Sequence, residues 1–307
     1  MNAATRLPTV SVVIPCYNQG QFLGEAVRSA VSQEGCRTEV VVVDDGSDQE
    51  ICTCEDAASG VRCIRQGNRG VAAARNAGLA SSTGEFLVFL DADDRLTPGG
   101  IAAGLAELER RPEAACAIGL CQVIGSDGGP RPFKQQQFAD PDPYRALLAA
   151  NFVWMPAQAI YRRAALLRHG GFDTAVPACS DYDLYLRIAR SDLMVCHEAV
   201  VADYRQHDAN MSGNGVLMLR SAVAVLERQW PHVRDRADYR RAFAAGSRFW
   251  REFYGDRVVE QIRAGVRGRS SAVKAARAAF TLLVYAPDMA VLHVMRKLRV
   301  LAGRIRG

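Results

Sequence analysis

The sequence FLVFLDADD, residues Phe86 to Asp94, places five consecutive apolar residues directly before a cluster of three carboxylates. An uninterrupted apolar run of this length is typical of a strand that is buried on both faces of a parallel sheet. Ligands bind outside the carboxyl ends of such strands, which is where Asp91, Asp93 and Asp94 would lie. Like charges this close repel one another unless a cation holds them, and hard divalent cations prefer oxygen ligands. An Asp-rich turn that caps a helix is the alternative that this motif leaves open.

Strands and helices alternate along the chain on both sides of this run. We expect strands at 10–14, 39–43, 61–64 and 86–90, and helices at 22–31 and 70–80. The alternation predicts an α/β fold with a mostly parallel central sheet, flanked by helices and joined by right-handed crossovers. The loops after the first, second and fourth strands would then bring Tyr17-Asn18, Asp44-Asp45 and Asp91-Ala92-Asp93 to one edge.

The second half of the chain has a less regular pattern. Apolar periodicity predicts helices at 101–111, 144–150 and 184–189, a strand at 114–124 and extended segments at 151–155 and 158–161. Asp181 and Asp183 lie at the start of the 184–189 helix. From Val216 onward the pattern is helical and rich in arginine.

The net charge of +5 over 307 residues conceals a strong asymmetry. Val216 to Gly307 hold 19 Lys and Arg against 7 Asp and Glu, so the rest of the chain is acidic. A basic C-terminal region can meet anionic lipid, nucleic acid or an acidic partner. Nucleic acid is disfavoured, because the basic residues lack interleaved aromatics or a known binding module.

The cysteines and the N-terminus indicate a cytoplasmic protein. The nine cysteines match no zinc-site spacing, and we expect them to be free thiols in a reducing compartment. Residues 1–8 lack the apolar core of a signal peptide, and no apolar run reaches the roughly 18 residues of a membrane span.

Several blocks of sequence, in order and at fitting spacing, resemble the inverting nucleotide-sugar glycosyltransferases of glycosyltransferase family 2. The blocks are VSVVIPCYN at 10–18, VDDGS at 43–47, NRGVAAARNAG at 68–78, GEFLVFLDADD at 84–94, and GGFD at 170–173 followed by SDYDL at 180–184. The resemblance spans residues 8–212 and implies the Rossmann-like GT-A fold. It divides the chain into a nucleotide-sugar-binding half (8–110), an acceptor-binding half (111–215) and a basic helical C-terminal region (216–307).

The resemblance also implies roles for individual residues. Asp45 would hydrogen-bond the nucleobase, and Asp181 would be the general base that deprotonates the acceptor hydroxyl. Asp91 and Asp93 would hold Mn²⁺ or Mg²⁺ against the departing diphosphate. The full set of expected substrate-binding residues is Pro15, Tyr17, Asn18, Asp45, Arg75, Asp91, Ala92, Trp154 and His207.

Each of these roles has a plainer alternative. Asp45 and Asp181 could serve only a turn and a helix N-cap, and Asp183 is a rival base. Arg75 could be a solvated helix arginine, and His207, in the family's Tyr-Arg-x-His element, a surface histidine. Trp154 would stack on the acceptor sugar or pack in the core.

The expected function is metal-dependent, inverting transfer of a single sugar from a UDP-sugar to a hydroxyl of a glycan or lipid-linked acceptor, in cell-surface polysaccharide or glycoconjugate synthesis. The Gln-x-x-Arg-Trp motif and transmembrane block of the family's processive synthases are absent from this sequence. A non-catalytic sugar-nucleotide-binding scaffold is the alternative. A nucleotidyltransferase is disfavoured, because the loop after the first strand has no lysine.

The last residues form a basic amphipathic pattern. An apolar stripe at Val291, Met295, Leu298, Ala302 and Ile305 is surrounded by arginine and lysine. Such a helix is expected either to lie on the inner face of the membrane, as a peripheral contact, or to pack on the catalytic domain.

Overall fold

The computed structural model describes residues 7–49, 51, 60–133, 136, 138, 140–208, 210–268, 271–293 and 295. The chain divides into two compact units. The first comprises Met1–Tyr144, Asn151–Ala175 and Ser180–His207, and the second comprises Arg145–Ala150, Val176–Cys179 and Asp208–Gly307. The predicted boundaries between the donor half, the acceptor half and the C-terminal region stay predictions.

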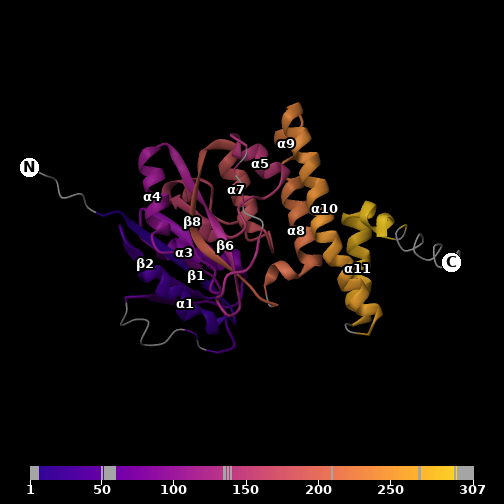
Figure 1. Cartoon of the computed structure of the whole chain (residues 1–307), viewed down its shortest axis with the longest axis horizontal. Helices are drawn as coiled ribbons and strands as arrows, with labels where there is room; N and C mark the ends of the chain where they lie inside the picture. The colour runs from indigo at the N-terminus through magenta and orange to yellow at the C-terminus, as the bar shows by residue number, and fades with distance from the viewer. Residues whose placement is uncertain are drawn as a thin grey trace, which may run out of the picture. The chain divides into compact units, whose positions relative to one another are not determined.

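The first unit is built on a mixed sheet whose described strands follow the order β3-β2-β1-β4-β7-β6-β8-β5 (Figure 1). Its strands are β1 (Thr9–Cys16), β2 (Arg37–Asp44), β3 (Arg62–Arg65), β4 (Phe86–Phe89), β5 (Arg95–Leu96), β6 (Ala114–Gly125), β7 (Ala159–Arg162) and β8 (Leu193–Gln206). The pairs β1–β2, β1–β4, β2–β3 and β6–β8 are parallel, while β7 and β5 pair antiparallel. The predicted α/β architecture is therefore confirmed, with its parallel half at the N-terminus.

Helices flank this sheet and connect its strands. They are α1 (Gly20–Val31), α3 (Val71–Ser81), α4 (Gly100–Arg110), α6 (Arg163–Arg168), α7 (Ser180–Ser191) and the short η1 (Pro156–Gln158), while α5 (Pro143–Ala149) spans both units. Helices α1 and α3 pack on β1 and β2, and α4 packs on β6 and β8. The helices predicted at 22–31, 70–80, 101–111 and 184–189 correspond to α1, α3, α4 and α7.

Strand β1 lies at the centre of the parallel half and is buried on both faces. Val12 pairs with Val40 of β2 on one side and with Val88 of β4 on the other. On the α3 face, Gly78 allows a close approach, because a Cβ at that position would lie 2.2 Å from Val13 Cγ1. The apolar runs in the sequence therefore form the layer that holds the polar loops in place.

Two features of the first unit differ from the sequence prediction. The sequence pattern gave no indication of β8, whose residues follow no regular alternation of buried and exposed positions and include charged side chains. Cys63 is disulfide-bonded. The expectation of free thiols is wrong at this position, because sequence spacing does not show which sulfur atoms meet. Among the other described cysteines, Cys16, Cys36, Cys116, Cys121 and Cys196 are free thiols.

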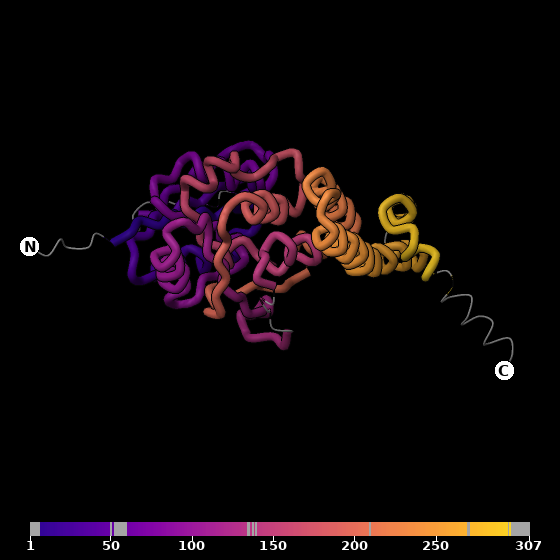
Figure 2. Tube along the Cα trace, turned by 90° about the horizontal axis from the view of Figure 1, so that it is seen from above, coloured from indigo at the N-terminus to yellow at the C-terminus, as the bar shows by residue number. Residues whose placement is uncertain are grey.

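The second unit is helical. It contains the short η2 (Met211–Gly213), α8 (Gly215–Glu227), α9 (Trp230–Val233), the long α10 (Ala237–Val266) and α11 (Ala272–Tyr285). Figure 2 shows α10 running beside α8 and α11, which pack on it (orange to yellow). Within the described part of the chain, no single helix has both the length and the apolar composition to cross a bilayer, although Ala272–Tyr285 and Pro287–His293 meet that test as a pair bent by 115°.

Candidate active site

The loops that follow β1, β2 and β4 meet at one edge of the sheet, as the alternation predicts. The Asp45 N–H donates to the carbonyl of Cys16 (2.9 Å), which joins the β2 loop to β1. The Gln19 side-chain amide donates to the Asp93 carboxylate (2.9 Å), which joins the β1 loop to the β4 loop. Because β1 lies between β2 and β4, these bonds assemble one polar cluster from three separate parts of the sequence.

The carboxylate of Asp45 organises the loop between β3 and α3. It accepts hydrogen bonds from Gln66 Nε2 (2.7 Å) and from the backbone N–H groups of Arg69 (2.9 Å) and Gly70 (2.8 Å). The side chain is buried, and a carboxylate has about four lone-pair sites. Asp45 thus retains the capacity for about one further hydrogen bond.

Residues Tyr17 and Asn18 form the loop that follows β1. Asn18 has a left-handed backbone (φ 55°), which asparagine tolerates better than most residues. Its side chain donates to the Asp48 carboxylate (3.0 Å) and accepts from the Asp48 N–H (2.9 Å), so it ties this loop to the β2 loop. Tyr17 is 46% exposed, whereas Pro15 is buried within the strand. Of these three side chains, Tyr17 and Asn18 are exposed and Pro15 is not.

The acidic residues after β4 form a turn in which each carboxylate has a different partner. Asp91 Oδ1 accepts from Arg75 Nη2 (2.7 Å). Asp93 Oδ2 lies 2.9 Å from His207 Nε2. Asp94 is fully enclosed, and burial together with the two neighbouring aspartates raises its pKa well above its usual range. The structure therefore brings Arg75, His207 and the predicted aspartates together, and the solvated-arginine alternative for Arg75 is wrong.

Arg205, on β8, holds the acidic turn in place and was not identified as a site residue from the sequence. Its guanidinium is buried, donates to the Asp93 carbonyl (2.7 Å) and forms an ion pair with Glu25 of α1. Its backbone N–H donates to the Asp94 carboxylate (2.8 Å), and its guanidinium lies over the Phe22 ring. The one signal in the sequence was the Tyr-Arg-x-His element, which draws attention to His207 rather than to the arginine.

Asp181 opens helix α7 close to the Arg75–Asp91 ion pair. Burial raises the pKa of Asp181, while the positive charge of Arg75 and the Tyr182 N–H oppose that shift. Burial lowers the pKa of Arg75, but the carboxylates of Asp91 and Asp181 together more than offset this, so the net shift is upward. Asp181, Arg75 and Asp91 are therefore electrostatically coupled groups at a single site.

Asp183, the rival base, is engaged in holding the structure together. Its carboxylate accepts from Arg187 Nε (2.8 Å), one helical turn along α7. The same guanidinium donates to the carbonyls of His169 (2.6 Å) and Gly171 (2.8 Å), which ties α7 to the preceding loop. Asp183 is buried and paired with Arg187, whereas the Asp181 side chain is only half-buried, so Asp181 is the more accessible of the two to a substrate.

Trp154 and Ala92 differ in their access to a ligand. Trp154 is 40% exposed and packs edge-on against Phe133 (ring centroids 6.1 Å apart), so it is not the core tryptophan that the plainer alternative supposed. Ala92 is fully buried and belongs to the apolar core, so only its backbone could contact a substrate.

The sequence pattern described as Glycosyl transferase family 2 matches residues 11–170, just over half of the chain. The chain belongs to glycosyltransferase family 2. The match contains the Asp45 loop, Arg75 and the acidic turn, whereas Asp181 and His207 lie beyond it.

Curated relatives of this family 2 chain include enzymes named for sugar transfer. An uncharacterized glycosyltransferase of Haemophilus influenzae is 29% identical over 58% of this chain and 61% of its own length. A chondroitin synthase of Pasteurella multocida is 26% identical over 60% of this chain and 19% of its own length. The chain thus spans less than two thirds of the length of either relative.

Solved structures share the fold. S. aureus TarS 1–349 in complex with UDP-GlcNAc superposes with a TM-score of 0.61 at 16% identity, covering 92% of this chain and 83% of that one. The mannosyltransferase PcManGT from Pyrobaculum calidifontis, in complex with GDP-Man and Mn²⁺, has a TM-score of 0.57 at 21% identity and covers 97% of this chain and 87% of that one. The family 2 chain therefore has the expected GT-A fold.

Two side chains of the family 2 site have the chemistry and spacing to share a divalent cation. Adjacent ligands of an octahedral Mg²⁺ site, each about 2.1 Å from the ion, stand about 3 Å apart. Asp93 Oδ2 and His207 Nε2 match this at 2.9 Å. No group of three or more His, Cys, Asp and Glu side chains among the described residues is arranged to hold a metal.

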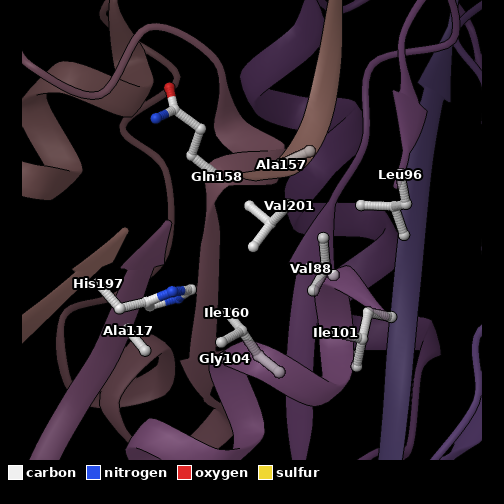
Figure 3. A pocket seen from close by; sticks show the side chains of 11 residues that line it. Val88, Leu96, Ile101, Gly104, Ala117, Ala157, Gln158, Ile160, His197 and Val201 are labelled. Atoms are coloured by element: carbon white, nitrogen blue, oxygen red, sulfur yellow. The ribbon is translucent and has the colours of Figure 1, made fainter. Parts of the chain in front are cut away.

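A cavity of about 10 Å³ lies elsewhere in the first unit, lined by Val88, Ile160, Val201 and His197 among others (Figure 3). It has room for about one water molecule, far below the several hundred Å³ of a ligand pocket. None of its lining residues belongs to the acidic cluster. It is a packing gap in the core rather than a second binding site.

Proposed function

We propose that this family 2 member transfers a single sugar, with inversion at the anomeric carbon, from a UDP-sugar to a hydroxyl of a glycan or a lipid-linked acceptor. The observation that carries the proposal is the electrostatic interaction of Asp181 with Arg75, whose guanidinium forms an ion pair with Asp91. A base on one side of a cationic and acidic diphosphate site is the arrangement that direct displacement requires. The fold shared with proteins bound to UDP-GlcNAc and GDP-Man supports a nucleotide-sugar donor.

In this mechanism Asp181 takes the proton of the acceptor hydroxyl while the oxygen of that hydroxyl attacks the anomeric carbon. The bond from that carbon to the diphosphate breaks as the new bond forms, so the nucleotide diphosphate leaves with its electron pair. Inversion needs one base and no protein nucleophile on the opposite face of the sugar. Asp181 meets that need, because its pKa is raised and its rival Asp183 is held by Arg187.

Arg75 orients the donor side of the reaction. Among the described residues its Nε has no hydrogen-bond partner, although the side chain is only 4% exposed. A buried, unpartnered guanidinium N–H is costly unless a ligand satisfies it. A diphosphate oxygen would do so, while Nη2 keeps Asp91 in place. A bound Mn²⁺ or Mg²⁺, held by Asp93 and His207 with Asp91 nearby, would supply Lewis-acid neutralisation of the leaving diphosphate.

The remaining binding roles follow from access. Asp45 has hydrogen-bonding capacity for the N–H of a nucleobase, and Tyr17 and Asn18 border the same loops. Trp154 offers an exposed aromatic edge to an acceptor sugar. Relatives named chondroitin synthase and succinoglycan biosynthesis protein ExoO support a place in cell-surface polysaccharide or glycoconjugate synthesis.

We also propose that the reaction takes place in the cytoplasm, at the inner face of the membrane. Val216 to Gly307 hold 19 basic and 7 acidic residues, and this positive charge supports contact with anionic lipid. Most of the basic helix expected at the C-terminus, including Leu298, Ala302 and Ile305, lies outside the described residues.

The decisive experiment is the Asp181→Asn variant. We expect it to bind UDP-sugar with unchanged affinity and to lose turnover by about 10²–10⁴-fold, the usual contribution of a general base. Donor binding is measured by calorimetry, and turnover is measured as acceptor-dependent release of UDP.

The Asp183→Asn variant is the matched control on the same helical turn. Because Asp183 is paired with Arg187, its loss should lower the midpoint of thermal unfolding but leave the turnover of the folded fraction near that of the wild type. If Asp181→Asn retains full turnover, the base assignment is wrong. Binding of donor with no turnover by the wild-type chain on any acceptor hydroxyl would favour the scaffold alternative.

A further inference from the structure

Helix α11 carries an exposed apolar stripe on the side away from its packed face. The stripe, here called the outer stripe, consists of Val273, Phe280, Leu283 and Val284, which are 76%, 67%, 63% and 53% exposed. Phe280 follows Val273 by seven residues, and Leu283 and Val284 follow Phe280 by three and four, so all of them lie along one side of the helix. The buried residues, which lie on the opposite side, are Ala278, Thr281 and Leu282. A helix with apolar residues on both sides needs a second apolar contact.

Further exposed apolar residues follow α11 in the chain. The chain bends by 115° into a short helix, Pro287–His293, where Val291 is 63% exposed and Leu292 is 40% exposed. Met295 is 48% exposed. Exposed apolar residues that gather in this way, rather than scatter singly, mark an interaction surface.

The charges around this surface identify what it binds. Residues 261–307 include ten Lys and Arg but a single acidic residue, Asp288. Lys274 and Arg277 are exposed on α11 itself, on one flank of the outer stripe. Two copies joined through this face would bring these positive charges together, which opposes self-association. A surface that is anionic outside and apolar inside would match both the basic residues and the outer stripe.

We propose that the outer stripe of α11 inserts into the interface of a bilayer that contains anionic lipid. The helix lies in the plane of the membrane surface, with Phe280 and Leu283 at the level of the upper acyl chains and with Lys274 and Arg277 reaching the headgroups. The inference goes beyond the proposed reaction and does not depend on it. It assigns the contact to a helix that precedes the basic C-terminal residues.

The test is cosedimentation of the full-length protein with vesicles of phosphatidylcholine, with and without phosphatidylglycerol. We expect the wild type to pellet with the anionic vesicles and little with the neutral ones. The double variant Phe280→Gln/Leu283→Gln should lower the vesicle partition coefficient by about ten-fold or more, because two apolar side chains no longer enter the bilayer. This variant keeps every basic residue, so it separates the stripe from the charged C-terminus.

The matched control is Leu167→Gln on α6, because Leu167 is 59% exposed and resembles Leu283 in accessibility. It should pellet like the wild type, and thermal unfolding should show that all variants are folded. The proposal is overturned if the wild type does not pellet with anionic vesicles or if the double variant pellets equally well. It is also overturned if the wild type sediments as a dimer that the double variant abolishes. No nucleotide sugar is present, so the outcome is independent of the proposed reaction.

Discussion

At the scale of single residues, the site is governed by opposing effects on a few buried charges. Enclosure of Asp181 favours its neutral form, whereas the guanidinium of Arg75 favours the carboxylate. Arg75 is itself held charged by Asp91 and Asp181. The proposed general base and the acidic turn therefore share one arginine, which predicts how the activity responds to pH.

We expect kcat/KM to fall with decreasing pH, with a midpoint above the ordinary aspartate value of about 4. A base works only when it is deprotonated, so a raised pKa moves the loss of activity to higher pH. In Arg75→Gln the opposing positive charge is gone, and the midpoint should move higher still. The measurement is a pH profile of UDP release at low donor concentration. Arg168→Gln, which removes an exposed arginine, should leave the midpoint unchanged; an equal shift there would contradict the assignment.

Arg205 provides a second prediction at this scale. In Arg205→Met, the Asp93 carbonyl loses a buried donor, whereas Glu25 is partly exposed and keeps Arg95 as a partner. We expect unfolding in urea to show a loss of stability of about 1–3 kcal/mol. Glu25→Gln should cost less stability in the Arg205→Met variant than in the wild type, because the Arg205 charge that it would leave unpaired is already gone. Strictly additive losses in this double-mutant cycle would show that the pair is not coupled.

At the scale of elements, the close approach of α3 to β1 places Arg75 over the edge of the sheet. Gly78 permits this approach, because a Cβ there would collide with Val13 at 2.2 Å. Gly78→Ala should therefore destabilise the fold by about 1–3 kcal/mol, the usual cost of overpacking, although alanine favours helices. Chemical denaturation measures the change.

Gly24→Ala on α1 is the control for this element-scale prediction. Its Cβ would meet only the flexible end of Arg28 at 3.2 Å, so the helix should gain about 0.5–1 kcal/mol. A Gly78→Ala variant that gains stability in the same way would show that α3 can move away from β1 without cost.

At the scale of the whole molecule, ligand binding should appear as added stability. A ligand at about a hundred times its Kd raises the free energy of unfolding by about 2.7 kcal/mol if it binds only the folded state. We expect UDP with Mn²⁺ to raise the melting temperature more than GDP with Mn²⁺. With either nucleotide, the rise in melting temperature should be smaller when a chelator is added. Asp93→Asn should reduce the difference that the metal makes. Equal stabilisation with and without metal would contradict the proposed cation site.

Local patterns in the sequence were sufficient to predict the parallel strands, most of the helices and the acidic cluster. Burial of a strand on both faces requires a continuous apolar run, and a helix repeats its apolar face at a fixed period. The same patterns, with the family resemblance, also led to Asp91, Asp93, Asp181 and His207. They did not indicate strand β8, the pairing of buried Arg205 with Glu25, or the contacts of Arg187 with the carbonyls of His169 and Gly171. Those features join residues far apart in the chain, or depend on which side of a helix meets a neighbour. They are decided by tertiary packing, because a buried charge takes whichever partner the fold brings within hydrogen-bonding distance.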